Sequence, residues 1–500
     1  MQVKKIAILC AAACAAMAGQ ASAAVDSGHT TLVNSAAARP IFISGASAVQ
    51  KGFVGIVDAT FDNTKPRVHF ANTTASSKDF QAVAGTLPVD AALGSWSGQN
   101  ALIVYRVKGG SVWGVNPVAK GDSIQTMTVT AAGCSGSAGA GTSSNPYVCP
   151  TTLADGSDGT VPDAGVSDVA PPLFQSPINT ENEPAQPALL PEQLGVLTMT
   201  PIYGLAFGVP VTNTVPSTAY LNKAKLAAIM AGNVGDWSSI DGSSDDMVIC
   251  RRVPGSGTQA VYNMYFGNYP CSNNPLDSNT PADRDTSLGT TWNGTSYNVV
   301  AGTGSVQVVE NSTSGDVRTC LDKAATGGSY TTKDRNGNNV TVQMNGGGHK
   351  AVGVLSMDSL SSSTTTGNWK FRSLDGAGSM TWAGGNNPVV TSGTGRFPTM
   401  ASYEDGTWDM QGWISFNVPT GRTVSPLSAE KLAVLTRFVT KAQNPLTLAK
   451  ITDLKNVAAG IPGGDYTSGP VTDAGVTYNT YVLKAGYLNG NQCAPYNGNY

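Results

Sequence analysis

The chain has 500 residues, with 30 lysines and arginines against 33 aspartates and glutamates, and a formal net charge of -3. This near-neutral balance gives no electrostatic reason to expect nucleic acid or an anionic membrane surface as a partner. An apolar content of 41% is enough for a sizeable core, which excludes wholesale disorder.

The N-terminus has the pattern of a secretory signal peptide. Two lysines precede the apolar run IAILCAAACAAMAG, and the tripeptide Ala-Ser-Ala ending at Ala23 is a small-x-small cleavage signal. We therefore expect residues 1–23 to be a signal peptide, cut near Ala23, and the mature protein to be periplasmic or secreted. The run is too short to favour a membrane anchor. A lipoprotein cysteine at Cys10 or Cys14 is a further alternative.

Six cysteines remain after that cleavage, and an even number in an exported chain predicts disulfides. Cys134 and Cys149 flank a Gly/Ser-rich loop that a local bridge would tie. Cys250 with Cys271 is the next pairing that we expect. The chain has no Cys-x-x-Cys pair and only three histidines, so we expect neither a zinc site nor any cofactor.

Strand and helix patterns alternate along the chain, which predicts an α/β fold. Residues 24–39 are small and polar, which predicts poor order. The expected elements follow in chain order: strand, glycine turn and helix at 41–57; a strand ending in a glycine turn at 101–115; a flexible surface insertion at 120–163; a strand end at 164–174; a helix at 220–237; a short strand at 247–253; long surface loops at 270–305 and 325–348; and a buried strand at 350–357.

The helix expected at 428–442 is amphipathic. Ser428 should be its N-cap. Its inner face should carry Leu432, Leu435, Phe438 and Val439.

Three glycine turns each follow an expected strand: SGASA at 44–48, GGS at 109–111 and PGSGT at 254–258. The first and third lead into helical patterns. A helix N-terminus presents unpaired N–H groups to an anion, and glycine lets the backbone approach a ligand closely. The guanidinium of Arg252 would add a planar fork that suits tetrahedral oxyanions. Arg251 should point to the other face of its strand and be solvated. Each turn taken alone is more often a plain turn.

The order and spacing of these turns resemble the periplasmic phosphate-binding proteins of ABC importers. The family motif Arg-x-Asp-Gly-Ser-Gly-Thr appears here as RVPGSGT at 252–258. The family's Gly-Ala-Gly-Ala-Thr turn resembles GASAV at 45–49, its Gly-Ser turn resembles the pair at 110–111, and its Gly-Ala-Ser-Asp-Ala-Pro segment resembles GVSDVAP at 165–171. The resemblance covers the chain patchily from about residue 41 to 445.

The resemblance implies a type II periplasmic-binding-protein-like fold with two lobes and long loop insertions. One lobe would combine 40–203 with 400–500, and the other would span 204–399. The ligand set would use hydroxyls, backbone N–H groups, one guanidinium and one carboxylate, drawn from Ser47, Ala48, Val49, Ser111, Asp168, Arg252, Ser256, Gly257 and Thr258.

Asp168 would accept a hydrogen bond from a protonated phosphate oxygen. Sulfate has no proton at neutral pH, so the same carboxylate would repel it. The sequence departs from the family at two points. Pro254 replaces an aspartate that would orient Arg252, and Val49 replaces a threonine hydroxyl. Both changes favour weaker or altered anion binding.

The resemblance therefore implies an exported phosphate-binding protein, the solute-binding component for phosphate uptake. It would be a monomer that works with an ABC importer in the membrane, and arsenate stays open as a ligand. An alternative is a surface or extracellular interaction protein on the same scaffold, with weak or no anion binding. We expect no enzyme, because neither a Gly-x-Ser-x-Gly elbow nor a His-Glu-x-x-His motif occurs.

Overall fold

The computed structural model describes residues 23–485 and Cys493, with internal gaps. The gaps are 48, 76–77, 154, 177, 181–185, 273–279, 285–290, 361, 364–366, 383–387, 405, 452–458 and 463–468. Nearly all of the expected signal peptide therefore lies outside the described residues.

One sheet is built around three parallel strands, β5 (Asn100–Arg106), β2 (Pro40–Gly45) and β8 (Ala164–Ser167). Antiparallel β4 (Phe80–Thr86) pairs with β5, and antiparallel β20 (Gln411–Val418) pairs with β8. Beyond β4 the sheet continues through β3 (Arg67–Ala71), β7 (Tyr147–Val148), β6 (Ser135–Gly136) and β1 (Ala23–Ala24).

A second group of parallel strands comprises β12 (Gln307–Asn311), β10 (Val248–Arg252) and β15 (Ala351–Gly353). The long strand β9 (Thr198–Thr212) lies next to β15. On the other side of β9, this sheet continues through β17 (Trp369–Arg372), β18 (Gly378–Trp382) and β19 (Pro388–Gly393).

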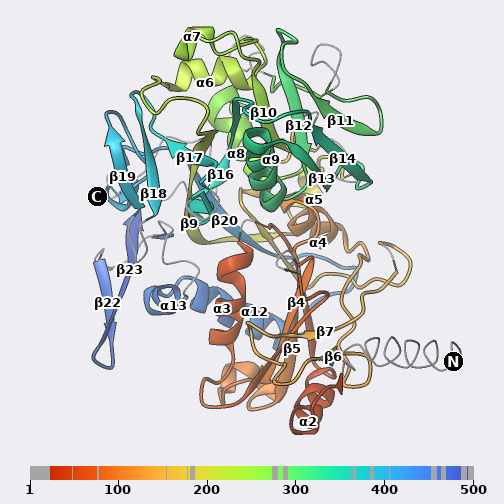
Figure 1. Cartoon of the computed structure of the whole chain (residues 1–500). Coiled ribbons are helices and arrows are strands. Elements are labelled where there is room, and N and C mark those ends of the chain that lie inside the picture. The colour runs from red at the N-terminus through yellow and green to blue at the C-terminus, as the bar shows by residue number, and fades with distance from the viewer. Residues whose placement is uncertain are drawn as a thin grey trace, which may run out of the picture.

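Strand β9 belongs to both groups. It pairs with β20 from Thr198 to Ala206, then with β16 (Leu355–Ser356), β15 and β17 over its C-terminal part. Near the change of partner it also meets β21 (Ala459–Pro462), beside β23 (Val476–Ala485) and β22 (Gly469–Asp473). The expected α/β, two-lobed fold class is confirmed (Figure 1). The lobe boundaries stay a prediction.

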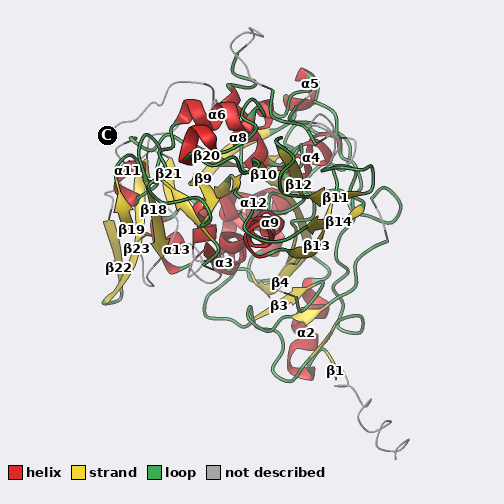
Figure 2. Cartoon of the chain, turned by 45° about the horizontal axis from the view of Figure 1, so that its top comes forward, coloured by secondary structure: helices red, strands yellow, loops and turns green. Residues whose placement is uncertain are grey.

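Helices pack against both groups of strands (Figure 2). Beside the first lie α3 (Gln50–Thr60), α12 (Ala429–Ala442) and α13 (Pro445–Lys450), and α12 packs on α3. Beside the second lie α8 (Gly257–Gly267) and α9 (Ser314–Thr326). Short helices also form at α4 (Asn116–Lys120), α5 (Pro191–Leu194) and α11 (Met400–Glu404).

Several expectations for irregular segments were wrong. Residues 24–39 contain helix α2 (Ser27–Ala36), which Asp26 caps by accepting a hydrogen bond from the Gly28 N–H. The segments expected as loops hold a small sheet of β11 (Ser296–Val299), β14 (Asn339–Met344) and β13 (Gly328–Lys333). In β14 every second side chain is buried, and this alternation explains why a polar segment forms a strand.

The expected insertion at 120–163 is packed rather than loose. It contributes β6 and β7 to the first sheet, and Met127, Val129 and Tyr147 are buried. The disulfide between Cys134 and Cys149 closes it, as predicted.

Two helix predictions are partly right. The pattern at 220–237 forms α6 (Lys223–Met230), capped by Asn222, and a separate turn α7 (Ser238–Asp241) follows. Helix α12 begins after Ser428, which accepts a hydrogen bond from the Lys431 N–H and is the predicted N-cap. Leu432, however, is 39% exposed, because the buried face runs through Val434, Leu435 and Phe438.

The second disulfide prediction was wrong. Cys250 pairs with Cys320, 70 residues away, and thereby fastens β10 to α9. Cys271 pairs with Cys493. Six cysteines allow fifteen pairings, and sequence spacing does not choose among them. Within the described residues, no helix is long and apolar enough to cross a membrane.

The disulfides Cys134–Cys149 and Cys250–Cys320 should stabilise the fold to different extents. A bridge removes more entropy from the unfolded chain when it closes a longer loop. We expect Cys250→Ala with Cys320→Ala to lower the free energy of unfolding by about 4 kcal/mol, and Cys134→Ala with Cys149→Ala by about 3 kcal/mol. Urea denaturation of both double variants gives the comparison. A larger loss from the shorter loop would contradict this account.

Candidate functional site

Three of the predicted segments meet in the structure. The N–H of Val112 donates to the carbonyl of Gly255 at 3.0 Å, which joins the second glycine turn to the third. The N–H of Asp168 donates to the hydroxyl of Ser111 at 3.1 Å, which joins the segment after β8 to the second turn. Residues far apart in the sequence therefore form one buried cluster, as the resemblance implied.

Gly257 lies at the centre of this cluster. A Cβ atom there would lie 2.3 Å from Ser111 Oγ, 2.6 Å from Asp168 Cβ and 2.9 Å from Asp168 Oδ2. Real Cβ atoms essentially never approach neighbours so closely. Gly110 is equally constrained, since its Cβ would lie 2.5 Å from the carbonyl oxygen of Gly255. The glycines are therefore required by close approach of the chains.

The first glycine turn lies beside the same cluster. The N–H of Ala46 donates to the carbonyl of Val166 at 2.9 Å, two residues before Asp168. The hydroxyl oxygen of Ser47 is buried and has no hydrogen-bond partner in the described part of the chain. Val49 is buried and precedes α3, but no side chain caps that helix. Ala48 lies outside the described residues.

Ser256 and Thr258 frame the start of α8. Ser256 is the N-cap, because its hydroxyl accepts a hydrogen bond from the Gln259 N–H at 3.4 Å. The hydroxyl of Thr258 donates to Asp168 Oδ2 at 3.4 Å. Both side chains are about 1% exposed. A helix N-terminus, two hydroxyls and a carboxylate thus share one buried volume.

Asp168 is 2% exposed, and its Oδ1 atom has no hydrogen-bond partner among the described residues. Burial raises the pKa of Asp168 to about 7; Arg252 lowers this pKa, and Asp358 raises it. A buried carboxylate oxygen without a donor costs free energy that a bound ligand could offset. Near neutral pH this group holds a proton about half of the time.

Arg252 is 2% exposed, and each nitrogen of its guanidinium donates to the turn between β12 and α9. Nε donates to the Asn311 carbonyl at 3.2 Å, Nη1 to the Ser314 hydroxyl at 3.1 Å, and Nη2 to the Ser312 carbonyl. These acceptors hold the guanidinium where Pro254 supplies no carboxylate.

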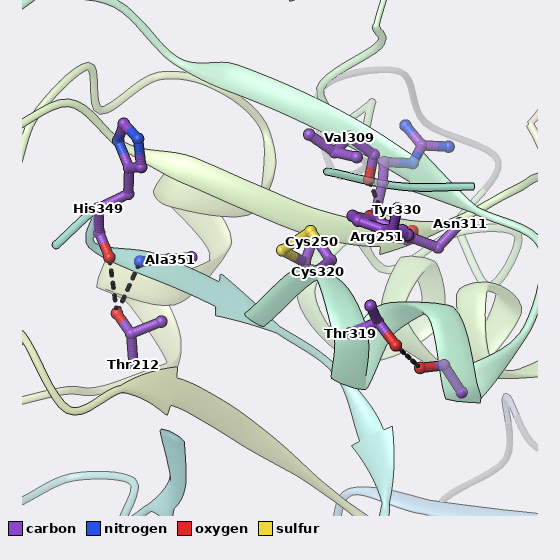
Figure 3. The surroundings of a disulfide bond; sticks show 11 residues. Thr212, Cys250, Arg251, Val309, Asn311, Thr319, Cys320, Tyr330, His349 and Ala351 are labelled. Atoms are coloured by element: carbon purple, nitrogen blue, oxygen red, sulfur yellow. Dashed lines mark hydrogen bonds between the residues drawn. A yellow bond between two sulfur atoms is a disulfide. The ribbon is translucent and has the colours of Figure 1, made fainter. Parts of the chain in front are cut away.

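The expectation that Arg251 is solvated was wrong, because it is only 3% exposed. Its Nη2 atom lies 3.7 Å from Oε1 of Glu310, a fully buried residue that also binds Arg335. Figure 3 shows Arg251 directed away from the disulfide of the neighbouring Cys250. Arg335, from the turn between β13 and β14, reaches Glu310 here, and every residue of β10 is buried, so both faces of the strand are internal.

A cleft of about 1410 Å³ runs along α3, and Ser47 and Gln50 line one side of it. On the α9 side it is lined by Ser314, Arg318 and Asp358. None of these three residues was predicted from the sequence as part of the site. The capping box of Thr313 and Asp316 at the start of α9 is a signal that could have located this helix. Among the described residues, no cluster of three metal-binding side chains occurs.

Gly257→Ala should force the turns apart. The added methyl group overlaps both Ser111 and Asp168, so we expect the free energy of unfolding to fall by about 1–3 kcal/mol. Gly235→Ala is the control, since the nearest atom to its Cβ lies at 3.4 Å. Chemical denaturation measures both. Equal stability of the two variants would contradict the packing described above.

The sequence matches no protein-family model and no curated protein. The chain is similar to the following three solved structures. A putative phosphate ABC transporter substrate-binding protein from Clostridium perfringens, with bound phosphate, has a TM-score of 0.38 and 11% identity over 84% of this chain and 98% of that chain. PstS from Borrelia burgdorferi has a TM-score of 0.34 and 9% identity over 84% and 98%. A human phosphate binding apolipoprotein has a TM-score of 0.33 and 13% identity over 60% and 78%.

Proposed function

We propose that the protein binds phosphate, or a closely related tetrahedral oxyanion, where the glycine turns meet. The observation that carries the proposal is the Oδ1 atom of Asp168, which is buried without a described donor beside the hydroxyls of Ser111 and Thr258. A protonated phosphate oxygen is a donor that would satisfy it. The unpartnered hydroxyl of Ser47 is a second group that a ligand would satisfy.

The ligand set expected from the sequence is retained in this proposal. Hydroxyls of Ser47, Ser111, Ser256 and Thr258 would bind the oxyanion, together with N–H groups near Val49, Ala48 and Gly257. Arg252 would balance its charge from the second group of strands. Because the second and third glycine turns are fixed by close packing at Gly110 and Gly257, the donors would need little rearrangement on binding.

If phosphate is the ligand, we propose that the protein is an exported solute-binding protein, the component of an importer that captures phosphate. Three disulfides among the described cysteines support an oxidising location. The alternative of an interaction protein with weak anion binding draws on one observation, namely that all three guanidinium nitrogens of Arg252 already donate to the protein.

Calorimetric titration of the mature protein with phosphate, arsenate and sulfate tests the proposal. We expect saturable phosphate binding at pH 8 and much weaker sulfate binding. Arsenate, which also carries a proton at this pH, should compete with phosphate. Absence of heat with all three anions would favour the interaction-protein alternative.

The protonation of Asp168 should make sulfate binding depend on pH. Below pH 7 the carboxyl group carries a proton and can donate to a fully ionised oxyanion; above pH 7 its charge repels one. The protonated fraction rises from about 0.1 at pH 8 to about 0.9 at pH 6, so sulfate affinity should rise about tenfold. Competition with phosphate measures this change.

Asp168→Asn supplies a neutral amide donor at every pH. We expect this variant to bind sulfate equally at pH 6 and pH 8. Asp79→Asn, which removes a carboxylate that lines the cleft, is the control and should keep the pH dependence of the wild type. Sulfate affinity that ignores pH in the wild type would remove Asp168 from the site.

A further inference from the structure

The turn between β12 and α9 forms one wall of the cleft, and Arg252 fixes its shape. As described above, the guanidinium holds Asn311, Ser312 and Ser314 at once. Of these, Ser314 lines the cleft that Ser47 also lines. The hydrogen bonds of Arg252 therefore fix the position of this wall.

Helix α9 is held rigidly behind that turn. The disulfide between Cys250 and Cys320 joins it to β10, the strand that carries Arg252 (Figure 3). The hydroxyl of Thr319 also donates to the carbonyl of Gly315 at 3.1 Å within the helix. Side chains on the first turns of α9 are thus presented to the cleft from a fixed support.

Arg318 is the cation on this support that faces the cleft. Its one described hydrogen bond runs from Nη1 to the hydroxyl of Ser359 at 3.1 Å. Its Nη2 atom lies 3.6 Å from where a Cβ of Gly315 would be, so the guanidinium folds back over the start of α9. Nε and Nη2 have no hydrogen-bond partner in the described part of the chain.

Carboxylates surround the same end of the cleft. Asp358 lines it and accepts hydrogen bonds from the hydroxyls of Ser356 and Ser359. Asp316 lines it too and belongs to the capping box of α9. Asp168 interacts electrostatically with Asp358, and Arg252 acts on both Asp168 and Asp316, so an oxyanion between these groups would meet three acidic groups and one buried guanidinium. A second cation is needed to make that environment favourable for an anion.

We propose that Arg318 supplies a second guanidinium to the bound oxyanion, from the α9 wall of the cleft. This inference rests on the proposed function. The fork of Nε and Nη2 has the geometry that binds two oxygens of a tetrahedral anion, while Nη1 stays anchored on Ser359. Gly315, without a side chain, leaves room for this guanidinium over the first turn of α9.

The test is calorimetric titration of Arg318→Gln, Arg318→Lys and Lys78→Gln with inorganic phosphate at pH 8. Lys78 is a matched control, because it also lines the cleft and its ammonium has no described partner. We expect Arg318→Gln to weaken phosphate binding about tenfold to a hundredfold, the range for loss of charged hydrogen bonds. Arg318→Lys should fall between this variant and the wild type, and Lys78→Gln should stay within about threefold of the wild type.

The outcomes separate the two proposals. Unchanged affinity of Arg318→Gln, in a protein whose wild type binds phosphate, overturns the role of Arg318 and leaves the proposed function standing. An equal loss in Lys78→Gln also overturns it, because the effect would then come from the general charge of the cleft. A wild type that binds no phosphate overturns the proposed function. Thermal melting of each variant confirms that a loss of affinity is not a loss of fold.

Discussion

The absence of a side chain at Gly257 is the constraint on which the candidate site depends. Ser111, Asp168 and the start of α8 occupy the volume that a methyl group would need. Three segments with different origins in the fold can meet there only because one of them has no Cβ. The hydrogen bonds from Val112 to Gly255 and from Asp168 to Ser111 then keep them in register.

This packing decides the electrostatics of the site. With its carboxyl group sealed inside the cluster, Asp168 loses hydration, and burial raises its pKa more than Arg252 lowers it. Arg252 cannot move closer, because the turn before α9 holds each of its nitrogens. The balance of charge around a guest is therefore set by rigid backbone, and not by side chains that can rearrange.

Much of this arrangement could be predicted from the sequence. The glycine turns could be located because close approach of chains and helix starts both require particular residue types. The contacts among Ser111, Asp168 and Thr258 result from the meeting of these turns. The burial of Arg251 could not be predicted, because it depends on Glu310 in β12 and on Arg335 in the turn between β13 and β14. Arg335 stands in a segment that looks like a loop, and β12 lies beside β10 by pairing with a strand that is distant in the sequence.

Strand β14 and helix α2 were expected to be irregular, although short sequence patterns mark both. Alternating apolar residues at Val340, Val342 and Met344 mark β14, and Asp26 marks the start of α2. The partner of Cys250 had no such mark, because disulfide pairing follows the fold and not the spacing. Arg318 was overlooked for a similar reason: nothing in its neighbours shows that α9 borders a cleft.

Strand β9 has a mechanical consequence. It exchanges β20 for β16 as its partner between Ala206 and Phe207, so one continuous backbone transmits twist from one group of strands to the other. Any rocking of the two halves must be absorbed as torsion over those few peptide planes. The indole N–H of Trp408 donates to the carbonyl of Phe207 at 2.8 Å, and the N–H of Phe207 donates to the carbonyl of Met410 at 2.9 Å, so two hydrogen bonds stiffen the strand where such torsion would concentrate.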